Sequence, residues 1–394
     1  MMKRVAMLLN GPIKNDYRVI KMIETLSRVH LVDLYYIKGN PIEDANIFNK
    51  NVRLFATNPQ EGIWNKLIRH TWFCYEFSFF QKMVLNTQTN YDSIWANDLP
   101  TLYPAFKISR ALKAKLIFDS HEIYTETINQ FFPRKSSGLK HFIFERMISF
   151  MRWHGKRIEK KIIPKTDTFI SVNESIVAFF KERYPIKRGI VIMNLPRKSQ
   201  SAENPTIDLK KQFLWNTDDH LILYQGQLNE GRGLSLLMES MELLPDEYKL
   251  VIIGNGSIQH QLIQWVNQKS LTNRIKFIDT IALRELPSYT AGADLGINLL
   301  ENFNLSKAMA SPNKLFEYIH AGIPVVASDT MENKRVFDQF NIGQLTSNTP
   351  ESISASIIQV VKQDKSSFHE ALQKAKTQYH WENQEDLLNS IIEA

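Results

Sequence analysis

Four residues in the last third of the chain could together bind a phosphorylated ligand. Ser311 and Pro312 favour the start of a helix, because serine caps helix N-termini and proline suits the first helical position. The free N–H groups at such a helix start attract anions, and Lys314 would add a positive charge beside them. Glu317 would lie roughly 7.5 Å beyond Pro312 along the axis, where it could accept hydrogen bonds from sugar hydroxyls. The spacing therefore suits a diphosphate joined to a sugar.

The same residues also suit an ordinary helix start. Helices after Ser-Pro are common, and the helix dipole alone favours a glutamate in the first turns. Gly322 and Pro324 would end this helix, and residues 323–327 would then form a buried strand. Both interpretations predict the same helix, and only the presence of a ligand separates them.

Two glycine-containing turns follow strand candidates in the same half of the chain. Residues 224–233 lie between a strand and a helix, where glycine would let the backbone approach a ligand and Arg232 could bind a diphosphate with two N–H groups. Residues 252–256 form a strand and a Gly-x-Gly turn, which makes Asn255 and Gly256 candidates. Each segment could instead be a plain turn of an α/β fold.

The first half of the chain offers two further candidates. Gly11 follows the first strand, and a glycine turn there could approach a sugar or diphosphate closely. The alternative is that Asn15 or Asp16 simply caps the next helix. His121 follows another strand together with Asp119 and Glu122, and it could be a ligand contact or a structural histidine. A zinc site is not favoured, because His121 and Glu122 lack the helical spacing of a metal pair.

Length and composition predict a two-domain protein of a reducing compartment. A chain of 394 residues exceeds one hydrophobic core, and its apolar fraction of 43% is ordinary for a globular protein. Its single cysteine, Cys74, excludes an internal disulfide. The apolar run Val5–Leu9 is too short for a secretory signal, and no run of 18 apolar residues is present. We expect a cytoplasmic protein.

The positive charge of the chain is concentrated in residues 131–165. Ten basic and two acidic residues give this segment a charge of +8, whereas the whole chain carries +7. Aromatic side chains such as Phe142, Phe144, Phe150 and Trp153 are interleaved with the charges. This composition favours a surface that meets an anionic membrane, peripherally on the inner face of the plasma membrane. The alternative is a partly buried helix with a solvated face; nucleic acid is not favoured, because no nucleic-acid-binding motif accompanies the charge.

Alternating apolar runs and amphipathic stretches predict an α/β fold with two doubly wound, parallel-sheet domains that face a cleft. The predicted parts are an N-terminal domain at 1–196, a polar linker at 197–211, a second domain at 212–375 and a C-terminal helix at 376–394. The predicted strands are Val5–Leu9, Leu31–Ile37, Ser93–Ala96, Lys115–Phe118, Thr168–Val172, Ile190–Met193, Leu221–Tyr224, Lys249–Ile253, Ile275–Phe277, Asp294–Leu299 and Val325–Ser328. The predicted helices are residues 18–28, 63–85, 234–243, 258–268, 283–291 and 381–394.

The segment 311–326 resembles the donor-site signature of retaining nucleotide-sugar glycosyltransferases of the GT-B fold, family-four type. That signature contains a glutamate, seven residues, a second glutamate, small residues, a glycine and a Pro-Val-Val-like strand. Glu317 and residues 321–326 match its second half. The first glutamate would fall at Met309, so the chain departs there and resembles the subgroup with a Ser-Pro-Asn-Lys loop.

The resemblance extends to the glycine turns. The family pattern is Gly-Arg-Leu, a short gap and Lys-Gly; here Gly226 and Leu228 match, Gln227 replaces the arginine and Arg232 stands at the lysine. It implies that His121 contacts the transferred sugar or the acceptor, and that the last helix packs against the first domain. The catalytic candidates are His121, Arg232, Lys314 and Glu317, and the donor-binding candidates are Gly11, Gly226, Gln227, Asn255, Gly256, Ile281, Ser311, Pro312, Asn313 and Leu315.

The resemblance further implies a retaining transfer from a nucleoside diphosphate sugar, with UDP as the default base, to a glycan or lipid-linked hydroxyl in cell-surface polysaccharide or glycolipid synthesis. Neither a metal nor a cofactor is expected, because Lys314 and Arg232 would stabilise the leaving diphosphate. Two alternatives stay open: a nucleotide-sugar epimerase, against which the missing acid at Met309 argues, and a non-catalytic nucleotide-sugar-binding partner of another transferase.

Overall fold

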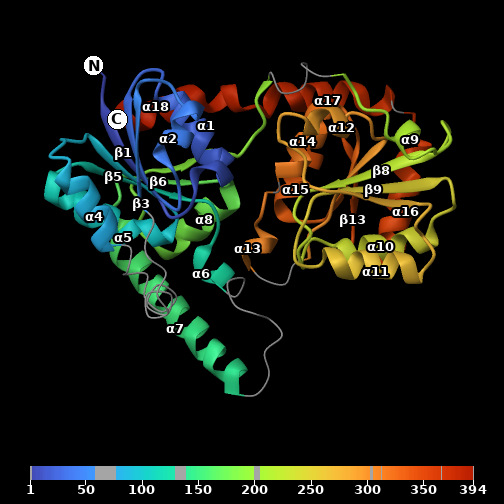
Figure 1. The fold of residues 1–394 in the computed structure, drawn as a ribbon, viewed down its shortest axis with the longest axis horizontal. Coiled ribbons are helices and arrows are strands. Elements are labelled where there is room, and N and C mark those ends of the chain that lie inside the picture. Colours follow the sequence, from blue (N-terminus) through green and yellow to red (C-terminus); the bar gives the residue numbers. More distant parts are fainter. Residues whose placement is uncertain are drawn as a thin grey trace. The chain divides into compact units, whose positions relative to one another are not determined.

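The computed structural model describes residues 2–57, 77–128, 139–198, 205–301, 305–311, 313–364 and 366–393. The chain divides into two compact units (Figure 1): unit 1 comprises Met1–Met193 and Gln384–Ala394, and unit 2 comprises Asn194–Asn383. The sequence placed these boundaries at 196 and 376, and α9 (Leu209–Gln212) overlaps the end of the predicted linker.

Unit 1 contains a seven-stranded, fully parallel sheet in the order β3-β2-β1-β4-β5-β6-β7. Its central strands are buried on both faces, as a parallel sheet covered by helices requires. The strands are β1 (Arg4–Leu9), β2 (Leu31–Ile37), β3 (Val52–Thr57), β4 (Ser93–Asn97), β5 (Lys115–Ser120), β6 (Thr168–Ser171) and β7 (Gly189–Val191). The helices are α1 (Tyr17–Leu26), α2 (Pro41–Asp44), α4 (Phe77–Asn86), α5 (Leu99–Leu112), α6 (Tyr124–Thr127), α7 (Leu139–Ile162), α8 (Glu174–Arg183) and α18 (Glu385–Glu393).

Unit 2 contains a six-stranded parallel sheet in the order β10-β9-β8-β11-β12-β13. The strands are β8 (His220–Gln225), β9 (Tyr248–Ile253), β10 (Ile275–Ile278), β11 (Leu295–Asn298), β12 (Val325–Ser328) and β13 (Gly343–Thr346). Besides α9, the helices are α10 (Leu234–Leu243), α11 (Gln259–Gln268), α12 (Leu286–Thr290), α13 (Leu305–Ala308), α14 (Asn313–Ala321), α15 (Met331–Phe337), α16 (Pro350–Lys362) and α17 (Ser366–Gln378).

The predicted fold class of two doubly wound parallel-sheet domains is confirmed. Helices cover both faces of each sheet (Figure 1). In each unit the first strand lies between the second and the fourth, so the strand order reverses beside it. Loops that leave the carboxyl ends of strands on either side of this reversal diverge and expose a site for ligands. The functional residues are therefore expected after β1 and β4 in unit 1, and after β8 and β11 in unit 2.

The last helix, α18, belongs to unit 1 and packs against α1. The Glu385 carboxylate accepts hydrogen bonds from Thr25 Oγ1 at 3.0 Å and from Arg28 at 2.6 Å. Just before α18, the Gln384 side chain pairs with the backbone N–H and C=O of Met193, at 2.9 and 2.7 Å. The chain thus leaves unit 1 after Met193 and re-enters it at Gln384.

Candidate functional site

Lys314 and Arg232 bring two positive charges to Tyr224, near the carboxyl end of β8. Lys314 lies in the first turn of α14 with only 7% of its surface exposed, and its Nζ lies 3.9 Å from the centroid of the Tyr224 ring. Burial raises the pKa of Tyr224 to about 12, against the lowering effect of the half-buried Arg232 guanidinium. Within the described residues, Arg232 forms no hydrogen bond or ion pair. Two cations beside a helix start provide a strong attraction for a diphosphate.

Glu317 lies one turn further along α14 and is held by a side chain of β8. The Gln225 amide donates to Glu317 Oε2 at 2.5 Å, and Gln225 Oε1 accepts from Thr290 Oγ1 at 2.8 Å. The Gln225 backbone N–H donates to the Tyr318 hydroxyl at 3.2 Å, which fixes the next residue of the helix to the same strand. Sequence reasoning missed Gln225. The signal that could have found it is a buried amide at the end of an otherwise apolar strand.

The two glycine turns of unit 2, at residues 226–228 and 254–256, are in close backbone contact. Gly226 and Gly254 have φ values of +127° and +137°, which favour glycine. A Cβ on Gly254 would lie 2.0 Å from the Gly226 carbonyl oxygen, and one on Gly256 would lie 2.3 Å from that of Leu228. The Leu228 N–H donates to the Asn255 carbonyl at 2.8 Å. By contrast, a Cβ on Gly226 would meet nothing within 4 Å, so the tip of this turn has space for a ligand.

The other predicted donor-binding residues of unit 2 differ in what they can offer. Gln227, Asn255 and Asn313 are exposed, and Ser311 and Ile281 are half-buried in loops. The Leu315 side chain is 1% exposed and belongs to the core, so only its backbone could meet a ligand. Pro312 lies outside the described residues.

In unit 1, the loop after β1 combines open space with a helix cap. A Cβ built on Gly11 would meet nothing within 4 Å. The Asp16 carboxylate accepts from the Val19 N–H at 3.0 Å, so Asp16 caps α1. The sequence had offered a ligand loop and a helix cap as alternatives; the cap is present and the glycine leaves room beside it.

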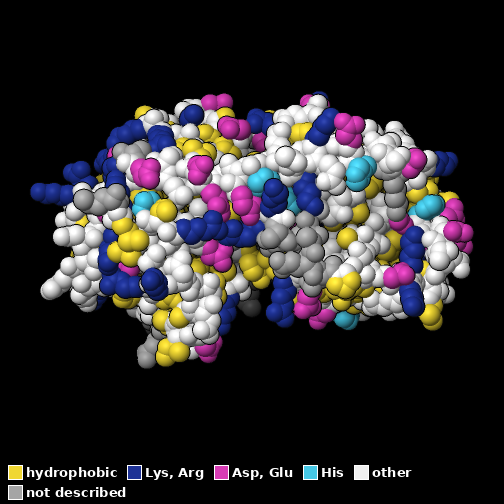
Figure 2. All heavy atoms as spheres, turned by 90° about the horizontal axis from the view of Figure 1, so that it is seen from above, with side chains coloured by type: hydrophobic (Ala, Val, Ile, Leu, Met, Phe, Trp, Pro, Cys, Tyr) yellow, Lys and Arg dark blue, Asp and Glu magenta, His cyan; other side chains and the backbone are white. Residues whose placement is uncertain are grey.

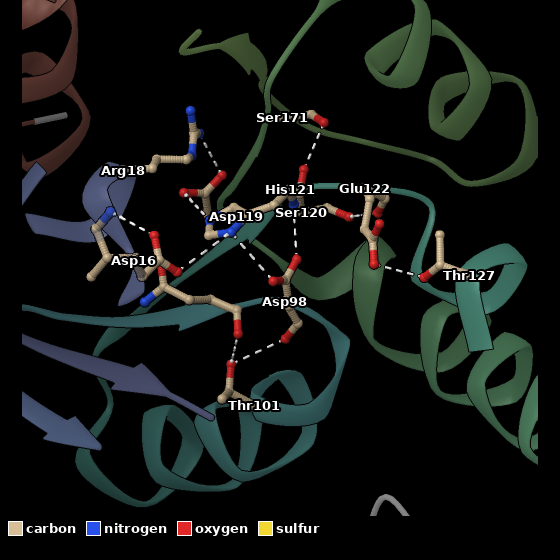
Figure 3. Close-up of polar contacts among 12 residues, drawn as sticks. Asp16, Arg18, Asp98, Thr101, Asp119, Ser120, His121, Glu122, Thr127 and Ser171 are labelled. Atoms are coloured by element: carbon tan, nitrogen blue, oxygen red, sulfur yellow. Dashed lines mark hydrogen bonds and ion pairs between the residues drawn. The ribbon is translucent and has the colours of Figure 1, made fainter. Parts of the chain in front are cut away.

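His121 lies among three carboxylates at the carboxyl edge of the sheet (Figure 3). Its Nδ1 is 3.3 Å from Asp98 Oδ2 and 4.0 Å from Asp16 Oδ2, and its Nε2 is 3.2 Å from Asp119 Oδ2. Arg18 contacts the other oxygen of Asp119 at 2.8 Å. These residues come from the start of α1 and from the ends of β4 and β5, and β4 is one of the two strands beside the reversal point.

The contacts make His121 a cation rather than a base. An ionised carboxylate only accepts hydrogen bonds, so both ring nitrogens must carry protons. Burial lowers the pKa of His121, but Asp98 and Asp119 outweigh it and raise the pKa to about 9. Burial raises the pKa of Asp98 to about 6, whereas for Asp119 the charges of Arg18 and His121 overcome burial and lower the pKa to about 2. Within the described residues, no group of His, Cys, Asp and Glu is arranged to hold a metal ion.

Asp98 has an unusual backbone, with φ of +61° and ψ of 166°, a region that residues other than glycine rarely adopt. Its N–H donates to the Asp119 carbonyl at 2.8 Å, and its Oδ1 accepts from the His121 N–H at 2.9 Å. The carboxylate therefore faces His121 instead of capping α5. Sequence reasoning did not single out Asp98, although an aspartate directly after a buried strand is a recognisable signal.

Comparisons with known proteins place the second unit in a family. Residues 206–378 match the family described as glycosyl transferases group 1. These residues form a group 1 glycosyl transferase domain. The O-antigen biosynthesis glycosyltransferase WclY of Escherichia coli is 26% identical over 159 residues. That alignment covers 39% of this chain and 41% of WclY, so it spans less than half of the relative's length.

The fold of the whole chain is that of GT-B glycosyltransferases. The Anabaena protein HepE, crystallised with UDP and glucose, aligns with a TM-score of 0.71 at 15% identity, over 99% of this chain and 98% of that one. WaaG, a glycosyltransferase involved in lipopolysaccharide biosynthesis, aligns with a TM-score of 0.69 at 15% identity, over 98% and 99% of the two chains. At these identities the likeness establishes the fold alone.

The group 1 glycosyl transferase domain contains every candidate residue of unit 2, including Arg232, Lys314, Glu317 and the newly found Gln225. Gly11 and His121 lie outside it. The matched residues thus cover the donor-site candidates of unit 2, whereas Gly11 and the acid–histidine cluster belong to unit 1.

Proposed function

We propose that this protein is a retaining glycosyltransferase of the family-four type with a Ser-Pro-Asn-Lys loop, which moves a sugar from a nucleoside diphosphate to a hydroxyl acceptor. The observation that carries the proposal is the pair of cations, Lys314 and Arg232, beside Tyr224 at the start of α14, with Glu317 one turn further on. The group 1 domain that contains them supports the same assignment.

In this proposal the donor diphosphate binds at the start of α14. Its charge is met by the N–H groups of the helix, by Lys314 and by Arg232, while the Glu317 carboxylate binds the ribose hydroxyls. We propose UDP as the nucleotide, which is supported by the complex of HepE with UDP and glucose. The open tip of the Gly226 turn would let backbone approach the diphosphate. In unit 1, the open space at Gly11 suits the same kind of backbone approach to a ligand.

The transfer needs no protein nucleophile. The acceptor oxygen bonds to the anomeric carbon on the same face from which the leaving group departs. The bond between that carbon and the diphosphate oxygen breaks. The acceptor proton moves to a donor phosphate oxygen, and the products are the glycoside and the nucleoside diphosphate. Lys314, Arg232 and the helix start stabilise the negative charge that develops on the leaving diphosphate. Because His121 is protonated and bonded to carboxylates, we assign it a charge-balancing role rather than that of a base.

The acceptor we propose is a glycan or lipid-linked hydroxyl, in cell-surface polysaccharide or glycolipid synthesis. The likeness to WclY, an O-antigen biosynthesis glycosyltransferase, supports this choice. We propose a cytoplasmic protein that acts on the inner face of the plasma membrane.

A two-stage experiment tests the proposal. A thermal-shift screen across nucleoside diphosphates should raise the melting temperature most with the cognate nucleotide, because ligand binding stabilises the folded state by mass action. The protein is then incubated with the matching nucleotide sugars and lipid-linked acceptors, and the anomeric configuration of the product is read by NMR. A product with the same anomeric configuration as the donor sugar supports the proposal. An inverted product, an epimerised donor, or binding without turnover would each refute the stated mechanism.

A further inference from the structure

The helix α7 presents two unlike faces. Ile148, Met151, Ile158 and Ile162 are at most 6% exposed and form its buried side. Large apolar side chains would not be expected on the opposite side of a helix in a water-soluble protein. Yet Phe142 is 55%, Phe150 38% and Trp153 52% exposed. The aromatic residues of this segment are therefore divided: some belong to the core, and three large ones face solvent.

The exposed aromatic residues alternate with basic ones along a single face. Phe142, Arg146, Phe150, Trp153 and Arg157 are separated by four, four, three and four positions, which places them in one row on an α-helix. We call this row the aromatic–basic face. The Arg146 guanidinium lies 5.2 Å from the Phe142 ring centroid and that of Arg157 lies 5.0 Å from the Trp153 ring, and the rings of Phe150 and Trp153 are 5.8 Å apart.

The charges of α7 are strongly unbalanced at its surface. The helix has seven basic and two acidic residues, a net charge of +5. One of the two acids, Glu159, is 3% exposed and accepts from the Tyr184 hydroxyl at 3.1 Å, so it does not neutralise the surface. In the described part of the chain, Arg146, Arg157, Lys160 and Lys161 form no ion pair with an acid.

The side of the molecule drawn in Figure 2 carries a different mix of charges. Basic and acidic side chains are interspersed there. Many other basic residues pair with nearby acids, as Lys374 does with Glu370 at 2.6 Å and Lys269 with Glu242 at 2.8 Å. The N-terminal half of α7 also extends away from the sheet of unit 1 (Figure 1). No helix in the described parts of the chain is long and apolar enough to cross a bilayer.

We propose that the aromatic–basic face of α7 is a docking surface for an anionic lipid bilayer. Aromatic rings prefer the boundary between headgroups and acyl chains, and Arg and Lys at the same depth meet the lipid phosphates. A single-stranded nucleic acid would also use aromatic and basic side chains, but such sites are grooves that follow the strand. Here the rings stand on the outer side of one helix, which suits a flat surface. This inference is independent of the transfer activity.

Vesicle co-sedimentation of the full chain tests the proposal. Binding should occur with vesicles that contain phosphatidylglycerol, be weak with pure phosphatidylcholine, and decrease as salt is added. The charge variant Arg146→Gln, Arg157→Gln, Lys160→Gln should lower partitioning on the order of 100-fold at low salt, about fivefold for each charge. A control variant, Lys269→Gln, Lys374→Gln and Arg335→Gln, removes as many exposed charges from unit 2 and should bind as the wild type does.

The aromatic residues are tested separately. Replacing Phe142, Phe150 and Trp153 by serine should also weaken binding, whereas Leu243→Ser with Met331→Ser, which are 52% and 55% exposed, should not. A second measurement does not depend on the stability of the triple serine variant. A polarity-sensitive dye is attached to a cysteine at position 153, in a Cys74→Ser background. Its emission should shift to the blue with anionic vesicles, and a dye at position 331 should not respond.

Three results would overturn the proposal: equal pelleting with neutral and anionic vesicles, no pelleting with either, or unchanged binding by the charge variant. Binding to a soluble RNA as tight as to anionic vesicles would also overturn it, in favour of a nucleic-acid surface. Because none of these measurements uses sugar transfer, failure of the docking surface and failure of the proposed enzyme activity are distinguishable.

Discussion

Replacing Asp98 by asparagine should stabilise the protein at neutral pH. The ordinary pKa of an aspartate is 3.8, and burial raises that of Asp98 to about 6 in the folded state. A carboxyl group whose pKa is higher in the folded than in the unfolded chain destabilises the fold once it ionises, by about 1.4 kcal/mol for each pH unit between the two pKa values. The ionised Asp98 therefore costs up to about 3 kcal/mol above pH 6. Asparagine carries no charge and tolerates a positive φ as well as aspartate does.

The gain has a defined pH dependence. Below pH 3.8 Asp98 is protonated in both the folded and the unfolded chain, so the substitution should change little. The stabilisation should grow between pH 3.8 and 6 and level off at about 1–3 kcal/mol above pH 6. His121 should then titrate at a lower pH than in the wild type, because Asp98 is the largest of the contributions that raise its pKa.

Urea unfolding across this pH range measures the free energy, and NMR of the histidine ring follows His121. Asp279→Asn, an exposed aspartate after β10, is the matched control and should show no such growth. We also expect the Asp98→Asn variant to lose transfer activity while it gains stability. A loss of stability at neutral pH, or a gain that does not vary with pH, would refute the reasoning about this half-buried carboxylate.

Three further predictions concern the proposed donor site. Glu317→Gln should weaken UDP binding, measured by titration calorimetry, with little change in melting temperature. Unchanged UDP affinity with a lowered melting temperature would show that Glu317 has a structural role. Lys314→Ala and Arg232→Ala should each lower turnover more than folding stability, since one charged hydrogen bond is worth about 1.5–3 kcal/mol; wild-type turnover would exclude them from the diphosphate site. Gln225→Leu should weaken UDP binding about tenfold by releasing Glu317, while Thr290 keeps its bond to the Leu286 carbonyl; unchanged affinity by titration calorimetry would show that Gln225 does not position Glu317.

The fold was largely predictable because buried parallel strands are continuous apolar runs. The bounds of β2, α10 and β12 coincide with the prediction, and the other predicted strands are shifted by one or two residues at their ends. Two strands were missed, β3 and β13, and both are edge strands whose residues are mostly half-buried. Their sequences, Val52–Thr57 and Gly343–Thr346, mix polar and apolar side chains, so no pattern marked them. The predicted helix at 63–85 falls largely outside the described residues, and its described part is α4.

The candidate site was predictable only as separate residues. Lys314 and Glu317 could be selected from the sequence because they follow a Ser-Pro helix start. Arg232 could be selected because it lies in a glycine-containing turn between a strand and a helix. The partners that give them their properties come from distant positions: Gln225 is 92 residues from Glu317, and Asp98 is 23 residues from His121. The protonation of His121 depends on such partners. The sequence analysis named Asp119 as a neighbour of His121. It could not give the distances to the carboxylates that keep the histidine protonated.

The path of the chain has a consequence for how the protein forms during synthesis. Because α18 completes unit 1, the surface of α1 that receives Glu385 stays uncovered until α18 leaves the ribosome. Unit 2, which is continuous from Asn194 to Asn383, emerges entire before then. We therefore expect the second unit to reach its native state first, although it is made second, and unit 1 to wait for its final helix. Deleting residues 385–394, which contain α18, should leave unit 2 folded and make unit 1 the target of proteolysis.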